Sequence, residues 1–163
     1  LPQDIVFLQV EEVDAAFHAR KCALGKYYEY RVLNNNVPTA IGSRYFYRYP
    51  YALNEDLVRQ GCRLLEGTHD FKSFSASGSS VKSFVRTLYA ADLVRQDDWW
   101  IFRFYGTGFL HNMVRIMVGT LLDIGNGRRP LANITHALAE NNRSLAGKTA
   151  PAQGLFLKMV FYP

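Results

Sequence analysis

A single arginine stands inside the most apolar stretch of this chain. Residues 108–122 read Gly-Phe-Leu-His-Asn-Met-Val-Arg-Ile-Met-Val-Gly-Thr-Leu-Leu, which predicts a buried helix with Arg115 in its middle. A guanidinium keeps its charge, so a buried one needs an acidic partner or strong hydrogen-bond acceptors. The residues three and four positions away share its side of the helix, and none is a carboxylate. The partner is therefore expected from elsewhere in the fold, from another chain or from a ligand.

A second interpretation of Arg115 is a structural one. An arginine near a helix end can pack its methylene groups against apolar neighbours and extend its charge to the surface. The helix sequence alone does not separate this interpretation from a buried, partnered guanidinium.

The composition describes an ordinary globular domain with a modest positive charge. The chain has 163 residues, of which 48% are hydrophobic and 20% charged, enough for one sizeable core. Its net charge of +5 is a weak indication of a polyanionic partner. Cys22 and Cys62 lack a metal-binding spacing and are expected to be reduced thiols in a cytoplasmic protein. With no membrane-length apolar run, no membrane partner is expected.

Periodicity and turn residues predict the elements that must position Arg115. Asn54 is a candidate helix N-cap with Gly67 as the stop, and Asp97-Asp98 is expected to turn a hairpin. The order predicts an α+β fold, a mainly antiparallel sheet with helices packed on one face. The expected strands are 5–13, 26–34, 85–95, 99–105 and 155–162, with an extended segment at 44–51 and helices at 54–66, 109–124 and 131–140.

Several short motifs recur in a fixed order along the whole chain. They are Leu1-Pro2-x-Asp4-Ile5, Phe17-His18-Ala19-Arg20, Lys26-x-Tyr28-x-Tyr30, Gly67-x-His69-Asp70-Phe71-x-Ser73-Phe74, Arg86-Thr87, Phe109-Leu110-His111-Asn112-Met113-Val114-Arg115-x-x-Val118-Gly119 and Pro151-Ala152-x-Gly154-Leu155. In this order they closely resemble the tRNA pseudouridine synthases of the TruA type, over residues 1–162. No zinc spacing, phosphate loop or nucleophile elbow competes with that resemblance.

The resemblance implies a fold, a reaction and partners. These enzymes have a pseudouridine synthase fold and isomerise uridine to pseudouridine in the anticodon stem-loop of tRNA. They break the N-glycosidic bond, turn the base and rejoin it through carbon, with no cofactor or catalytic metal. The target base must first leave the helical stack. The family also implies a homodimer, with tRNA lying across both subunits.

The family's nucleophile does not occur in this sequence. It is an aspartate in a Gly-Arg-Thr-Asp-Ala-Gly motif, which lies upstream of Leu-Pro-x-Asp-Ile in the family. The chain begins without Met, so residues 1–163 are expected to be the C-terminal domain of a longer synthase. Asp4, Asp70 and Asp123 lack the nucleophile's sequence context. The isolated chain is therefore expected to be inactive without its N-terminal half.

Two functional residues carry over from the family by motif. Tyr28 matches the tyrosine that stacks on the target base and assists proton removal from its carbon. Arg115 matches the arginine that pairs with the catalytic aspartate, which supplies an acidic partner for the buried guanidinium. Without the motif, Tyr28 would be interpreted as a core tyrosine on a strand face beside Tyr30.

Basic residues form three candidate contacts for tRNA phosphates. Arg20, Lys21 and Lys26 lie near Tyr28 in the sequence, and we expect Arg20 and Lys26 to bind substrate. Two further pairs are Arg44 with Arg48 and Arg128 with Arg129. The alternative for each is an ordinary solvated surface charge.

Two other function classes stay open at this point. The basic and aromatic residues also suit a non-catalytic RNA-binding module, which predicts affinity that falls steeply with salt. The apolar, aromatic-rich sequence also suits a structural or dimerisation domain that exposes a surface for a partner.

Overall fold

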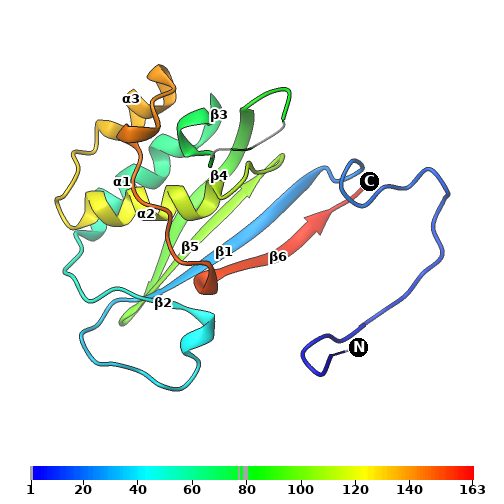
Figure 1. Ribbon diagram of the computed structural model, residues 1–163, viewed down its shortest axis with the longest axis horizontal. Helices are drawn as coiled ribbons and strands as arrows, with labels where there is room; N and C mark the ends of the chain where they lie inside the picture. Colours follow the sequence, from blue (N-terminus) through cyan, green and yellow to red (C-terminus); the bar gives the residue numbers. More distant parts are fainter. Residues whose placement is uncertain (1, 77, 79–80) are drawn as a thin grey trace.

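The fold is a sheet with helices packed on one face, which confirms the predicted α+β class (Figure 1). The computed structural model describes residues 2–76, 78 and 81–163, so Leu1 of the first motif lies outside it. The strands are β1 (Gly25–Leu33), β2 (Tyr47–Arg48), β3 (Gly67–Asp70), β4 (Val85–Gln96), β5 (Trp99–Gly106) and β6 (Leu155–Phe161). The helices are α1 (Glu55–Leu65), α2 (Met113–Gly125) and α3 (Asn133–Glu140).

Strand β1 carries most of the pairings of the sheet, and β5 lies in the middle of the strand order. The order is β2-β1-β5-β4-β3, and β6 also pairs with β1. Only the short β1–β2 pairing is parallel among the described strands. Side chains alternate between the two faces. Tyr30 lies opposite Phe102 and Val32 opposite Trp100, all buried on the helix face.

Turn and cap residues act where the sequence predicted. The Asn54 side chain accepts a hydrogen bond of 3.0 Å from the Leu57 amide and so caps α1. Gly67 follows that helix with φ of +102°, a conformation that favours glycine. Asp97, with φ of +53°, turns the β4–β5 hairpin.

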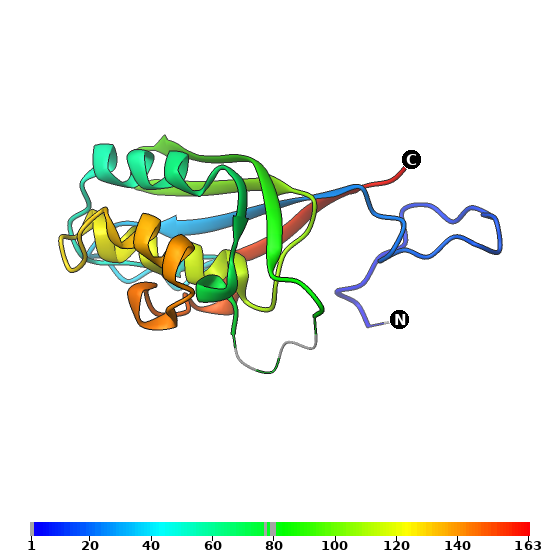
Figure 2. The ribbon, with the colours of Figure 1, turned by 90° about the horizontal axis from the view of Figure 1, so that it is seen from above.

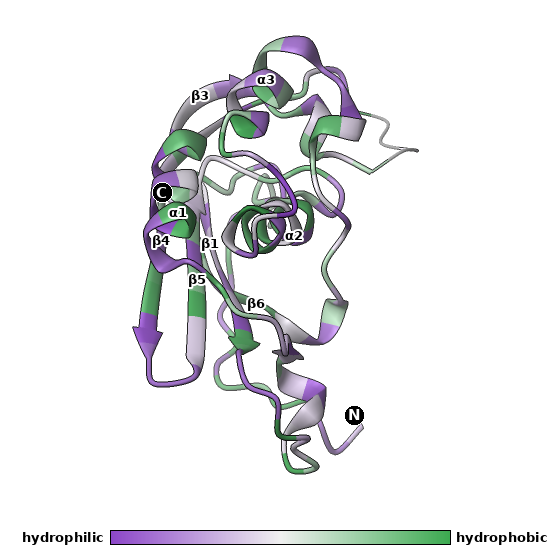
Figure 3. Cartoon of the chain, turned by 90° about the vertical axis from the view of Figure 1, so that its left-hand side faces the viewer, coloured by the Kyte–Doolittle hydropathy of each residue, from purple (hydrophilic) through white to green (hydrophobic). Residues whose placement is uncertain are grey.

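Helix α2 forms the centre of the hydrophobic core. It packs against α1 and beside the sheet (Figure 3). Its buried residues are spread around most of its circumference. This distribution is that of an internal helix rather than of an amphipathic surface helix. Across the described residues, no helix has the length and apolar character needed to cross a membrane.

The predicted strand at 5–13 is wrong. These residues form no strand, and the segment runs away from the sheet (Figures 1 and 2). Val6, Leu8 and Val10 are 73%, 95% and 83% exposed. A strand needs a neighbour for its backbone N–H and C=O groups, and none of the described strands pairs with this segment.

Three other boundaries differ from the prediction. Asn112 has φ of +59°, which a helix interior does not allow, so α2 begins at Met113 rather than at 109. The extended segment at 44–51 contains a 3-10 turn over Ser43–Tyr45, and only Tyr47–Arg48 pairs with β1. The short strand β3, which pairs with β4, was not predicted.

Candidate functional site

Tyr28 presents an aromatic ring on the helix face of β1. The ring is half-buried and meets Phe109 edge to face, with centroids 4.9 Å apart and planes at 78°. Phe109 comes from the turn before α2. Burial raises the pKa of the Tyr28 hydroxyl, so it is protonated at neutral pH. The site therefore holds an oriented ring with a neutral hydroxyl.

Arg115 is held by two uncharged oxygens. Its Nε donates to the Ala150 carbonyl at 2.6 Å, and its Nη1 donates to Asn112 Oδ1 at 3.0 Å. No carboxylate of the described chain lies within ion-pair distance of Arg115. Neutral oxygens thus supply the acceptors that the Arg115 guanidinium needs. No counter-ion for its positive charge lies within the described structure.

The position of Arg115 on α2 adds to this positive potential. Because the helix starts at Met113, Arg115 lies in its first turn rather than in its middle. The N-terminal turn of a helix carries partial positive charge from its unpaired amides. The first turn of α2 contains no acidic residue to offset it. This end of α2 therefore favours an anion.

The segment before β6 links strand β1 to Arg115. Tyr30 lies two residues after Tyr28 on the same face of β1, and its hydroxyl donates to the Pro151 carbonyl at 2.6 Å. The preceding carbonyl, that of Ala150, accepts from Arg115. The Tyr30 hydroxyl and the Arg115 guanidinium are therefore anchored to the same short stretch of chain, and Tyr28 shares the strand face of Tyr30.

The two predicted basic substrate contacts lie in different places. Lys26 shares the face of Tyr28 at the start of β1. Arg20 lies in the segment before β1 and lines an open groove of about 700 Å³. The groove, which we call the basic groove, is lined by His18, Arg20, Lys21, Val81, Lys82, Ser83 and Arg86. It joins two segments that are distant in the sequence and concentrates positive charge between them.

Most of the other predicted basic residues already bond to neighbouring protein groups. Asp123 lies 3.3 Å from Arg129 Nε and 4.0 Å from Arg128 Nη1. Arg129 also donates to the Ser144 carbonyl, which ties the end of α2 to a neighbouring loop. Arg48 donates to the Asn36 carbonyl. These interactions engage Arg48 and Arg129, whereas the Arg128 side chain stays 53% exposed.

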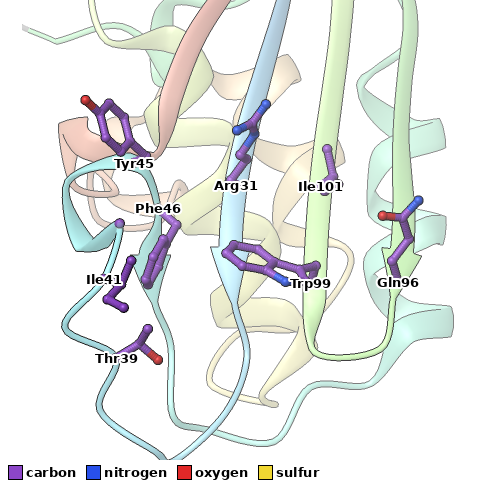
Figure 4. A pocket seen from close by; sticks show the side chains of 9 residues that line it. Arg31, Thr39, Ile41, Tyr45, Phe46, Gln96, Trp99 and Ile101 are labelled. Carbon is purple, nitrogen blue, oxygen red and sulfur yellow. The ribbon is translucent and has the colours of Figure 1, made fainter.

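A second hollow lies on the opposite face of the sheet (Figure 4). It has a volume of about 390 Å³, and most of its walls are apolar. Arg31, its one cation, is committed to Glu29 at 2.7 Å and lies over the Phe156 ring at 4.3 Å. None of the predicted site residues lines this hollow, so it is separate from Tyr28 and Arg115.

Sequence reasoning missed several residues that build the site. No role was predicted for Asn112, although its amide oxygen is an acceptor for Arg115. The backbone oxygens of Ala150 and Pro151 left no side-chain signal, although they belong to a motif. Lys82 and Arg86 join Arg20 only through the tertiary structure.

The chemistry available at this site is the binding of a flat ring and of an anion. Tyr28 offers an aromatic surface, and Arg115 offers unused guanidinium N–H groups. Nowhere in residues 2–76, 78 and 81–163 do histidine, cysteine and acidic residues cluster in a way that could hold a metal ion. An aromatic ring that packs on Phe109 and a cation in the first turn of the helix that follows Phe109 suit a nucleotide substrate.

Comparison with known proteins identifies the family. Residues 62–163 match the family model described as tRNA pseudouridine synthase. Proteins named tRNA pseudouridine synthase A from Geobacillus sp. (strain WCH70) and from Clostridium acetobutylicum are 48% and 45% identical over 162 residues, 99% of this chain. A protein named tRNA pseudouridine synthase A 1 from Bacillus cereus (strain ZK / E33L) is 47% identical over the same length.

These relatives are longer than the present sequence. The 163 residues span 65% of the Geobacillus protein and 66% of the Bacillus and Clostridium proteins. The family model covers most of the chain, including α2, β6 and the segment that anchors Arg115. The chain therefore belongs to the tRNA pseudouridine synthase family.

Proposed function

We propose that the protein converts uridine to pseudouridine in the anticodon stem-loop of tRNA. In this proposal residues 1–163 supply Tyr28 and Arg115, and an N-terminal half supplies the nucleophilic aspartate. One observation carries the proposal: the Arg115 guanidinium is held by two neutral oxygens and has no carboxylate partner among the described residues, in the helix that follows Phe109, the residue that packs on the Tyr28 ring. The match to the tRNA pseudouridine synthase family supports pseudouridine formation as the reaction at this site.

Arg115 serves to bind and orient the incoming carboxylate. The Ala150 carbonyl occupies its Nε, so we infer that the carboxylate meets the edge formed by Nη1 and Nη2. A two-pronged contact at that edge holds a carboxylate ionised and fixes its direction. An ionised aspartate is what attack on the ribose or the base requires.

Tyr28 serves to hold the flipped base and to assist the loss of its proton. The isomerisation breaks the bond between N1 and C1′ and forms one between C5 and C1′. C5 then loses a proton, and N1 gains one. A stacked ring contributes about 1–3 kcal/mol to holding the flipped base. Because the Tyr28 hydroxyl is protonated, we assign it the role of a proton relay: its oxygen accepts the proton that leaves C5 as its own proton passes to solvent.

The basic groove and Lys26 supply contacts for RNA phosphates. Arg20, Lys82 and Arg86 lie in one groove, and such clusters bind a phosphate backbone through charge. We further infer a cytoplasmic homodimer with tRNA across both subunits. Exposed apolar residues such as Val6, Leu8 and Met159 support an additional protein surface over this domain.

The proposal is tested by comparing the 163-residue chain with the complete protein on tRNA that carries tritium at uridine C5. We expect the complete protein to release tritium and the isolated chain to release none. The isolated chain is expected to bind tRNA with an affinity that falls steeply with salt, because the basic groove favours RNA binding as the second candidate function. Tritium release by the isolated chain would show that the nucleophile lies within it.

Tyr28→Phe separates stacking from proton transfer. In the complete protein we expect a nearly unchanged KM, because the ring still stacks, and a fall in kcat of about 100-fold, because a positioned proton-transfer group is lost. Steady-state tritium release measures both constants. Tyr89→Phe, at an exposed ring, is the matched control and should leave both unchanged. An undiminished kcat in Tyr28→Phe would limit Tyr28 to stacking.

A further inference from the structure

The segment 147–151 runs along α2 and contacts it at both ends. The Gly147 amide donates to Thr120 Oγ1 at 2.8 Å, and the Ala150 amide donates to the Arg115 carbonyl at 3.0 Å. The Arg115 side chain returns a bond from Nε to the Ala150 carbonyl at 2.6 Å. Arg115 is thus bonded to Ala150 through both its backbone and its side chain.

Gly119 makes this close approach possible. A Cβ atom at this position would lie 1.8 Å from the Lys148 carbonyl oxygen, inside any allowed contact. With only hydrogen there, the segment lies directly on the helix backbone. The position of the Ala150 carbonyl is therefore set by backbone packing, and the direction of the Arg115 guanidinium depends on that carbonyl.

Tyr30 fixes the far end of the same segment. Its side chain is fully buried, and its hydroxyl donates to the Pro151 carbonyl at 2.6 Å. Burial raises the pKa of this hydroxyl, so it stays a donor. Gly154 lies against the ring, where a Cβ would be 2.8 Å from it. Tyr30 thus holds the chain immediately after Ala150.

We propose that Tyr30 is a positioning residue, which aims Arg115 by holding the Ala150–Pro151 carbonyls in place. Thr120 does the same from the other end of the segment. This inference rests on the proposed function, because Arg115 must be aimed at a carboxylate for its direction to matter. Tyr30 itself does not touch the substrate.

The test is Tyr30→Phe in the complete protein, alone and combined with Arg115→Lys. The phenylalanine keeps the packing but leaves the Pro151 carbonyl without its donor. We expect kcat to fall about 10-fold with little change in KM, because a small displacement of a catalytic group is costly. In the Arg115→Lys background the same change should alter kcat less than about 2-fold, because effects of residues that act as a unit are not additive.

Tyr49→Phe is the matched control. Tyr49 is also a buried tyrosine whose hydroxyl bonds to α2, at the Leu122 carbonyl near the other end of the helix. Its loss should lower thermal stability about as much as Tyr30→Phe and leave kcat unchanged. An unchanged kcat in Tyr30→Phe, or effects that multiply in the double variant, would overturn the proposal.

Two further measurements keep the outcome clear. If Tyr30→Phe does not fold, Thr120 offers a second test. We expect Thr120→Val to lower kcat and Thr120→Ser, which keeps the hydroxyl, to have the kcat of the wild type. Equal kcat values in these two variants would count against the proposal. Solvent exchange of the Arg115 Nε proton, followed by NMR, should speed up in Tyr30→Phe. This exchange reports the anchoring even if the wild-type protein shows no activity on tRNA, so failure of the inference and failure of the proposed function are distinguished.

Discussion

Replacing Arg115 with lysine in the complete protein is expected to lower kcat for pseudouridine formation about 100-fold, the loss typical of removing one positioned donor to a charged group. Lysine keeps the positive charge but not the fork of N–H groups. It cannot bond Ala150, Asn112 and a carboxylate in the geometry that Arg115 provides. Tritium release from uridine C5 under saturating tRNA measures the effect.

The same variant should remain folded, since the Arg115 side chain is not fully buried and its partners are neutral. Thermal unfolding within a few degrees of the wild type is the expected result. Arg59→Lys is the matched control, because Arg59 is a structural arginine that bonds Glu55 on α1. It should leave kcat unchanged. Near-normal turnover in Arg115→Lys would falsify the role proposed for the guanidinium.

Gly119→Ala is expected to destabilise the protein by about 2–3 kcal/mol, as overpacking of a filled core does. Helix propensity alone predicts that the substitution stabilises the protein, since alanine is favoured over glycine inside a helix by about 1 kcal/mol. The new methyl group would lie 1.8 Å from the Lys148 carbonyl oxygen, which is backbone and cannot rotate away. Packing therefore outweighs propensity. Equilibrium unfolding in urea measures both the sign and the size of the change in the free energy of unfolding.

Gly108→Ala is the control for this prediction. A Cβ there meets only the Arg86 side chain at 3.9 Å, an ordinary contact, and Gly108 does not have a positive φ. We expect its unfolding midpoint to stay close to that of the wild type. A stabilised Gly119→Ala would mean that segment 147–151 does not lie on α2 as the structure has it.

The two ends of helix α1 and the β4–β5 hairpin turn were predicted correctly from nearby residues. Asn54, Gly67 and Asp97 act as the cap, stop and turn that their residue types indicated, because each acts through backbone groups a few residues away. Strand 5–13 was wrong for the complementary reason. The apolar run at 5–8 is typical of a strand, but a strand also needs a neighbour for its backbone groups, and no described strand pairs with this segment.

The start of α2 shows how one backbone torsion changes the interpretation of a residue. No glycine or proline interrupts residues 109–118, so composition places Arg115 in mid-helix. The positive φ of Asn112 delays the helix to Met113 and moves Arg115 into its first turn. Asn112 then becomes an acceptor for the guanidinium instead of a neighbour on the next turn.

By itself the sequence determined the α+β class and the family resemblance, and it predicted Tyr28 and Arg115 as site residues, because ordered motifs and periodicity are properties of the chain alone. Tertiary structure decided what those residues contact. The Ala150 and Pro151 carbonyls carry no side-chain signal, and they reach Arg115 and Tyr30 only because Gly119 admits their segment. Likewise, Lys82 and Arg86 join Arg20 only when the chain folds, since charges distant in sequence act together only when they are close in space.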